Sequence, residues 1–169
     1  MSIPHIVSPV LLLGELNPRG ADPRLALYHM PPGCSGDRLR RILGLSPAAY
    51  LRLDRVNLCD WRWEPEAAYA RYEEVLRALD LPSAPPRLTI ALLGARVREA
   101  TRGPAPFRVV SFTTWQSGRK CHLVGLPHPS GRCREWNKPG AVDEARRLLR
   151  QVAPEVPWGE VGASKKEDA

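Results

Sequence analysis

Four short runs of apolar residues divide the chain, and each is nearly continuous rather than alternating with polar positions. They are VLLLGEL at 10–16, RVNLC at 55–59, RLTIALLG at 87–94 and CHLVGLPH at 121–128. Continuous apolar runs of this length are typical of strands that helices cover on both faces of a sheet. A fifth segment, FRVVSFT at 107–113, is either a further strand or the edge of a loop.

Helical patterns lie between these runs. SGDRLRRILGL has a candidate N-cap at Ser35 and places its apolar residues on one face. The segment 64–79 is the clearest helix, with acidic residues early and apolar residues spaced for a buried stripe. GARVREATRG and PGAVDEARRLLRQV follow the third and fourth strands. The alternation predicts a three-layer α/β/α sandwich around a central, mostly parallel four-stranded sheet.

Length and cysteine usage limit the organisation of the chain. The 169 residues predict one domain over 1–160 and a short, charged, disordered tail at 161–169. No stretch is long enough to span a bilayer, and the N-terminal segment lacks a secretory signal pattern. Four isolated cysteines, without a Cys-x-x-Cys pair, argue against a zinc ribbon and favour a reducing cytoplasm.

The charge balance favours a polyanionic partner. Lys and Arg total 25 against 18 Asp and Glu, which gives a formal charge of +7. Clustered basic side chains release counterions when they bind phosphates, and arginine, which dominates here, suits bidentate phosphate contacts. A basic protein whose arginines are simply solvated remains the alternative explanation.

Polar segments follow three of the predicted strands. They are Glu15 to Gly20, Asn57 to Asp60 and His128 to Arg132. Ligands of open parallel sheets bind in the crevice outside the carboxyl ends of the strands. We therefore expect these segments to converge on one edge of the sheet.

These segments resemble a known family. GELNPRG at 14–20, NLC at 57–59 and HPSGR at 128–132 are similar to the three signature segments of the uracil-DNA glycosylase superfamily. The match is closest to the single-strand-selective monofunctional branch, and Pro-Ser-Gly is also similar to the mismatch-specific branch. The resemblance covers roughly residues 8–150. The first loop departs from the family pattern, because two residues rather than one separate Gly14 from Asn17.

The resemblance implies a monofunctional DNA glycosylase. Such an enzyme flips a nucleotide out of the DNA and hydrolyses the N-glycosidic bond of uracil or a related base, leaving an abasic site. It would act on DNA as a monomer, without a membrane, metal or other cofactor. The cysteine spacing argues against the iron–sulfur cluster of some family members. No lysine stands in a motif for Schiff-base chemistry, so lyase activity is not expected.

Each matched residue has an expected role. Asn57 reads the base, because its amide oxygen accepts the uracil N3–H and its nitrogen donates to O4, a pattern that cytosine reverses. His128 donates a hydrogen bond to O2 as negative charge develops there. Asn17 orients the attacking water. Glu15 is the rival for that role, as a general base or a stabiliser of the cationic sugar, unless it forms an ion pair with an arginine.

The remaining substrate contacts come from neighbours of these residues. Tyr28 would stack on the flipped base, with ordinary core packing as the alternative. The resemblance implies that Gly14, Pro18 and Ser130 complete the substrate pocket.

Contacts to DNA are expected on both sides of the pocket. Ser35 and Arg38, at the start of a helix, would grip a phosphate, unless they form only a cap and a basic face. The turn after His128 contributes a second set, in which Arg132 is a wedge or a phosphate contact and Trp136 either supports the loop or covers the pocket. The DNA-binding residues of this turn are Gly131, Arg132, Cys133 and Arg134.

Two other functions fit the same segments. The fold could serve as a DNA-binding module without activity, because the altered first loop could have lost the water. It could also hydrolyse a different base or a free nucleoside, because membership of a superfamily does not fix the substrate.

Overall fold

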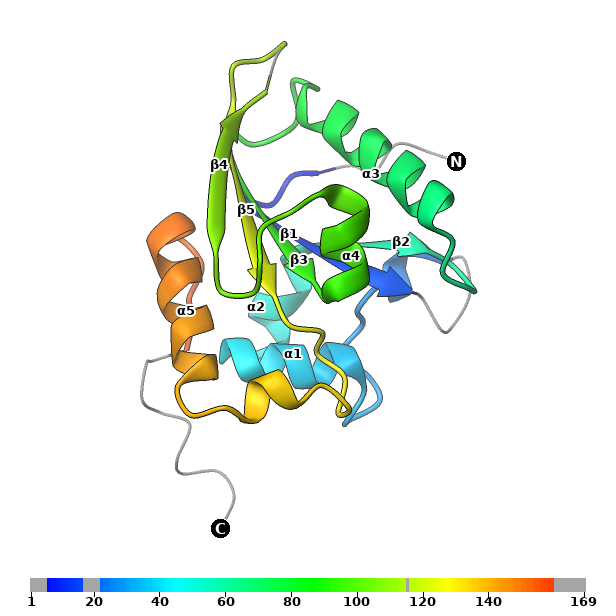
Figure 1. Ribbon diagram of the computed structural model, residues 1–169. Helices are drawn as coiled ribbons and strands as arrows, with labels where there is room; N and C mark the ends of the chain where they lie inside the picture. The colour runs from blue at the N-terminus through cyan, green and yellow to red at the C-terminus, as the bar shows by residue number, and fades with distance from the viewer. Residues whose placement is uncertain (1–5, 17–21, 115, 160–169) are drawn as a thin grey trace.

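The computed structural model describes residues 6–16, 22–114 and 116–159, and it forms an α/β fold around one central sheet (Figure 1). The strands are β1 (Val10–Leu16), β2 (Asp54–Cys59), β3 (Arg87–Leu93), β4 (Val109–Thr113) and β5 (Lys120–Leu126). The helices are α1 (Ser35–Leu43), α2 (Pro47–Leu51), α3 (Pro65–Leu79), α4 (Ala95–Thr101) and α5 (Ala141–Val152). Asn17, Pro18 and the predicted tail at 161–169 lie outside the described residues.

The sheet has five strands in the order β2-β1-β3-β5-β4. β2, β1, β3 and β5 are parallel, and β4 pairs antiparallel with β5. The predicted count of four strands is therefore wrong, because the segment that the sequence left open forms β4. β4 is an edge strand with Val110, Ser111 and Thr113 exposed, so it lacks the continuous apolar run of the strands that helices cover on both faces.

Helices cover both faces of the sheet, as the four apolar runs predict. Successive side chains of a strand point to opposite faces. Val10 and Leu12 of β1 accordingly pack in one core with residues of α1, α2 and α5. Leu11 and Leu13 pack in a second core with residues of α3 and α4. The central strands β1 and β3 carry nearly continuous apolar runs because both of their faces are buried.

The predicted helix at 64–79 is confirmed to within one residue. α3 begins at Pro65, a residue that tolerates the first helical turn because its missing N–H would have no partner there. Its buried residues include Ala68, Tyr72, Val75 and Leu79, the spacing of one helical face. No helix within the described ranges is long and apolar enough to cross a membrane.

The start of α1 differs from the prediction in its cap. Cys34, not Ser35, is the N-cap, and its Sγ accepts the N–H of Asp37 at 3.4 Å and lies 3.2 Å from the carbonyl oxygen of Tyr28. A Cβ at Gly36 would lie 2.2 Å from that same carbonyl oxygen. Glycine therefore allows the first turn of α1 to pack directly against the backbone of Tyr28.

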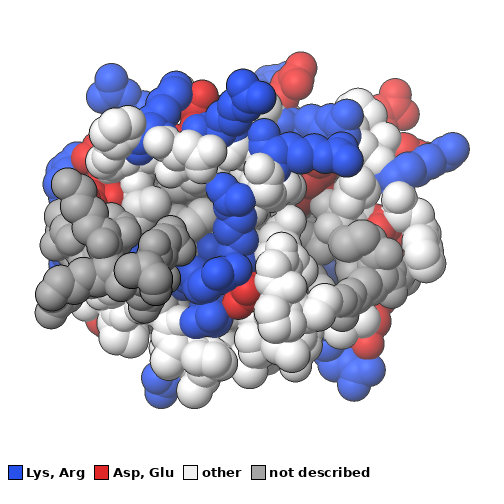
Figure 2. All heavy atoms as spheres, turned by 90° about the horizontal axis from the view of Figure 1, so that it is seen from below, with Lys and Arg blue, Asp and Glu red and all other residues white. Residues whose placement is uncertain are grey.

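Basic side chains are present across the face of the molecule on which α1 lies. Figure 2 views the structure from below, the side on which α1 and the 3₁₀ turn Arg134–Asn137 lie in Figure 1, and shows Lys and Arg spread across this face. β3 and β5 also end toward this side. Part of the positive charge of the chain therefore lies on the side of the sheet where ligands of parallel sheets bind.

Candidate functional site

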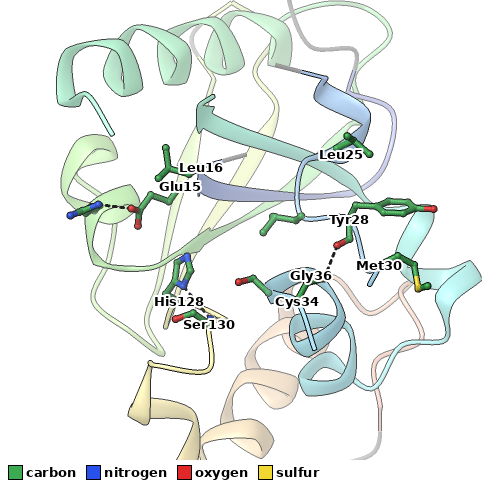
Figure 3. Close-up of a pocket in the computed structure, with 12 residues that line it drawn as sticks. Glu15, Leu16, Leu25, Tyr28, Met30, Cys34, Gly36, His128 and Ser130 are labelled. Atoms are coloured by element: carbon green, nitrogen blue, oxygen red, sulfur yellow. Dashed lines mark hydrogen bonds and ion pairs between the residues drawn. The ribbon is translucent and has the colours of Figure 1, made fainter. Parts of the chain in front are cut away.

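A cavity of about 440 Å³ opens at the carboxyl edge of the sheet (Figure 3). Its walls come from the end of β1, the segment before α1, the first turn of α1 and the turn after β5. Glu15 and His128, from two of the three segments that the sequence predicts to converge, both line it. Apolar side chains such as Leu16 and Leu25 form much of the remaining wall.

His128 is held in one tautomer by its own turn. The backbone N–H of Ser130 donates to Nδ1 at 3.1 Å, so Nδ1 is the unprotonated nitrogen and Nε2 carries the hydrogen of the neutral ring. The indole N–H of Trp136 donates to the backbone oxygen of His128 at 3.0 Å. Gly94, just after β3, lies under the ring, because a Cβ there would be 3.1 Å from His128 Cδ2.

The surroundings of His128 favour the neutral ring. Burial lowers the pKa of His128 below its ordinary value of 6.5, because a buried imidazolium loses hydration. The negative charge of Glu15 opposes this effect and raises the pKa, but it is the smaller cause. The histidine is thus an uncharged hydrogen-bond donor near neutral pH, with no described residue bonded to Nε2.

Glu15 forms an ion pair at the wall of the cavity. Its Oε1 lies 2.7 Å from Nη1 of Arg96, and the Glu15 side chain is 17% exposed while that of Arg96 is 57% exposed. The ion pair that the sequence left open is therefore present. Asn17, the rival for the water, lies outside the described residues.

The structure brings Asn57 and Gly14 together. They are register partners on β2 and β1, and a Cβ at Gly14 would lie 2.2 Å from Asn57 Oδ1. Only glycine leaves room for this amide. Both polar atoms of the Asn57 side chain are buried without a partner among the described residues. Asn57 does not line the cavity, but Leu27, which does, packs against the same glycine.

Tyr28 lines the cavity, but its ring points away from His128 (Figure 3). The ring instead contacts that of His29, with centroids 4.9 Å apart. This orientation gives no support to the predicted stacking on a base held at His128. The part of Tyr28 that contacts α1 is its backbone oxygen.

The basic rim joins α1 to the turn after His128. A Cβ at Gly131 would lie 3.5 Å from Nη1 of Arg38, so this helix and this turn are neighbours. Arg132 and Arg134 are exposed on the same turn. Cys133 is half-buried and packs against the core, so its predicted contact with DNA is not supported. Ser35, the remaining predicted phosphate contact, lines the cavity from the first turn of α1.

Three residues of the site were missed or left open by sequence reasoning. Arg96 and Gly94 follow β3, which also ends at the carboxyl edge, and this place after a strand is the signal in the sequence that points to them. Trp136 is buried, and its contact with the His128 backbone identifies it as a support of the loop. Its ring packs edge-on against Phe107, with centroids 5.8 Å apart.

The described residues contain no group of three or more His, Cys, Asp or Glu side chains able to hold a metal ion. All four cysteines are free thiols, and Cys59 and Cys121 are buried. No protein-family model matches the chain, and no curated protein sequence matches it.

Proposed function

We propose that this protein is a monofunctional DNA glycosylase that hydrolyses the N-glycosidic bond of uracil or a closely related base in DNA. The observation that carries the proposal is the neutral, tautomer-fixed His128 at the wall of the cavity. Glu15 on the neighbouring wall, the unpartnered Asn57 and the basic rim support it.

His128 supplies the donor that this reaction needs. As the bond between base and sugar breaks, negative charge develops on O2 of the departing base. A neutral imidazole whose Nε2–H faces that oxygen stabilises the charge, and it does so more strongly in the transition state than in the bound substrate. The backbone N–H of Ser130 keeps the hydrogen on Nε2, so no energy is spent on reorienting the ring during the reaction.

The cavity suits one flipped nucleotide. Its volume of about 440 Å³ is in the range of small-ligand sites, and such sites combine apolar walls with a few polar groups. Leu16, Leu25 and Leu27 would contact the flat base, and Glu15 and His128 would face its polar atoms or the sugar. A duplex base cannot reach such a site without leaving its stack.

Among the described residues, Glu15 is the best candidate to activate the attacking water or to stabilise the cationic sugar. Its carboxylate is held in place by Arg96, and its charge is felt at His128. A carboxylate can accept a proton from water, whereas the amide of Asn17 could only orient it. Asn17 remains the alternative that the family pattern suggests.

The side-chain amide of Asn57 has no hydrogen-bond partner among the described residues, which supports a role in recognising the base. A buried amide with neither polar atom bonded is destabilising by about 1–3 kcal/mol per group. Buried polar groups of native proteins almost always have hydrogen-bond partners, and a bound ligand is one source of the missing ones. The N3–H and O4 of uracil would satisfy both atoms, provided that the Leu27 side chain beside the amide moves when the base binds.

The test is base release from defined oligonucleotides. The protein is incubated with labelled strands carrying uracil, hydroxymethyluracil, xanthine or hypoxanthine, and abasic sites are then cleaved with alkali. Cleavage that His128→Ala abolishes supports the proposal. Tight binding without cleavage would instead favour a DNA-binding module, and release from monomers alone a nucleoside hydrolase.

A second variant separates the role of Asn57 from folding. Asn57→Leu removes two unpartnered polar atoms, so its thermal midpoint should be equal to or above that of the wild type. Its uracil cleavage should nevertheless fall to a small fraction of the wild-type rate. Unchanged cleavage would remove Asn57 from the recognition of the base.

A further inference from the structure

A second cavity, of about 410 Å³, lies between α5 and the pair formed by β4 and β5. Its strand wall includes Val109 and Ser111 of β4, which lie two residues apart and so point to the same face of the sheet. His122 of β5 is the register partner of Ser111 and lines the cavity beside it. The proposed function uses none of these residues, so the cavity is a separate candidate site.

The helical wall of this cavity is one stripe of α5. Its members recur on successive turns of the helix, and they are Glu144, Arg147, Leu148, Gln151 and Val152. Leu148 and Val152 are buried, whereas Arg147 and Gln151 are exposed. The cavity therefore combines apolar groups with a few polar ones, as small-molecule sites do.

Phe107 lines the cavity just before β4, and its backbone is held in an unusual conformation. Its φ of 58° lies in the left-handed region, which a bulky side chain rarely adopts, and its N–H donates to the Gly125 oxygen at 2.8 Å. The ring packs edge-on against that of Trp136, with centroids 5.8 Å apart. Phe107 is therefore a positioned aromatic residue in the cavity wall.

Arg108 brings positive charge that no carboxylate contacts directly. Its guanidinium forms no hydrogen bond or ion pair with any residue of the described ranges. Glu144, the one acidic side chain among the described residues that line the cavity, accepts hydrogen bonds of 2.7 and 2.9 Å from Arg147. These bonds are the main reason that the pKa of Glu144 is lowered, and the charge of Arg108 adds to the lowering.

The electrostatic potential is positive at the strand wall as well. Burial is the main reason that the pKa of His122 is lowered, and the charges of Lys120 and Arg87 lower it further. Ser111 Oγ lies 2.8 Å from His122 Nδ1, and when the hydroxyl donates to that nitrogen the ring carries its hydrogen on Nε2. An anion in the cavity would meet positive charge together with neutral hydrogen-bond donors.

We propose that this cavity binds a small organic phosphate, with the phosphate group at Arg108 and a flat, apolar body against Phe107 and Leu148. The three terminal oxygens of a phosphate monoester are strong acceptors, and a guanidinium donates to two of them at once. The amide of Gln151, which also lines the cavity, adds a neutral donor. The apolar body gains affinity from the area that it buries on the two apolar side chains.

An NMR titration of isotope-labelled protein with phenyl phosphate at low salt tests this proposal. The indole N–H resonance of Trp136 should shift, because its ring packs on Phe107, and that of Trp61, after β2 at the opposite edge of the sheet, should not. Arg108→Gln should weaken binding about tenfold, because a charge-assisted hydrogen bond is lost. Arg132→Gln is the matched control, because it removes an exposed arginine from the turn after β5, and it should change the affinity by less than about twofold.

Glu144→Gln reports the sign of the charge on the ligand. It removes a negative charge from the cavity and releases Arg147, so phenyl phosphate should bind about twofold to fivefold more tightly. Weaker binding by Glu144→Gln together with tighter binding by Arg108→Gln would overturn the proposal, because that pattern belongs to a cation site. Circular dichroism should show the same fold for every variant, because Arg108 and Arg132 are exposed and Glu144 is only half-buried.

Two further probes separate the phosphate from the body that carries it. Inorganic phosphate should bind about tenfold more weakly than phenyl phosphate, and uncharged benzyl alcohol should not bind measurably. Equal affinity for either probe and phenyl phosphate would overturn the proposed ligand class, and equal losses in Arg108→Gln and Arg132→Gln would overturn the location. Absence of phenyl phosphate binding would overturn the site. These measurements use no DNA, so their outcome is independent of the proposed glycosylase activity.

Discussion

Two cavities of similar size each have one histidine in their wall, and the two imidazole rings differ in the contact that holds them. The candidate site has a volume of about 440 Å³ and contains His128. The second cavity, about 410 Å³, lies between α5 and the β4–β5 pair and contains His122. Nδ1 of His128 is bonded to a backbone N–H, whereas Nδ1 of His122 lies 2.8 Å from the hydroxyl oxygen of Ser111.

A backbone N–H can only donate, but a hydroxyl can donate or accept. The first contact therefore selects one tautomer of His128, while the second accommodates either tautomer of His122. The charges near the rings also differ. Glu15 raises the pKa of His128 against the effect of burial, whereas Lys120 and Arg87 add to the lowering that burial causes at His122. Only the first cavity combines a fixed donor with a nearby carboxylate.

Removing each imidazole tests this comparison most directly. His128→Ala should lower the rate of base release by about 10²–10³, because it removes a donor used in the transition state. His122→Ala should leave the rate within about twofold, because nothing in its cavity selects a donor. Single-turnover cleavage of a uracil oligonucleotide measures both. Equal rates for the two variants would remove the distinction between the cavities.

Two buried tryptophans distinguish an effect on catalysis from an effect on stability. Trp136→Phe removes the hydrogen bond to the His128 oxygen, and Trp158→Phe removes a similar bond to the Ala153 oxygen at 2.8 Å. Both side chains are 6% exposed, so each variant should lose about 1–3 kcal/mol of unfolding free energy. Only Trp136→Phe should lower kcat, about fivefold to tenfold with KM unchanged. A matching loss of kcat in Trp158→Phe would show that the effect is general destabilisation.

The pH dependence tests the charge next to each ring. Because burial lowers the pKa of His128, kcat should stay constant near neutral pH and fall only as the pH drops through a value below 6.5. The contribution of His128 to folding stability has the same sign, full above 6.5 and declining as the pH falls toward the lowered pKa. Glu15→Gln removes a charge that raises this pKa, so the acid limb of its residual activity should move to lower pH. Lys120→Gln, which alters the surroundings of His122, should leave the limb in place.

The smallest effect is expected at the basic rim. Arg132→Ala should weaken duplex binding a few fold and reduce the slope of log affinity against log salt by about 1, because one phosphate contact is lost. Arg147→Ala is the matched control, because Arg147 is an exposed arginine at the second cavity, where it pairs with Glu144. Fluorescence anisotropy over a series of salt concentrations gives both slopes. An unaltered slope for Arg132→Ala would exclude this residue from the DNA interface.

Much of the fold was predictable because each central strand is apolar on both faces. β1 is found over Val10–Leu16 as predicted, and the other three runs lie within two residues of the observed strands. The sequence left β4 open between a strand and a loop edge because an edge strand needs no continuous apolar pattern. The cap of α1 was misassigned because a cysteine thiol takes the place that a serine hydroxyl usually fills.

The sequence alone determined which segments end at the ligand edge, since parallel strands carry their loops to the same side whatever the details of packing. Tertiary structure decided the rest. It turned the Tyr28 ring away from His128, buried the Asn57 amide against Gly14 and joined Glu15 to Arg96, which lies 81 positions along the chain. Side-chain direction and long-range pairing depend on neighbours from other elements, and no local pattern contains that information.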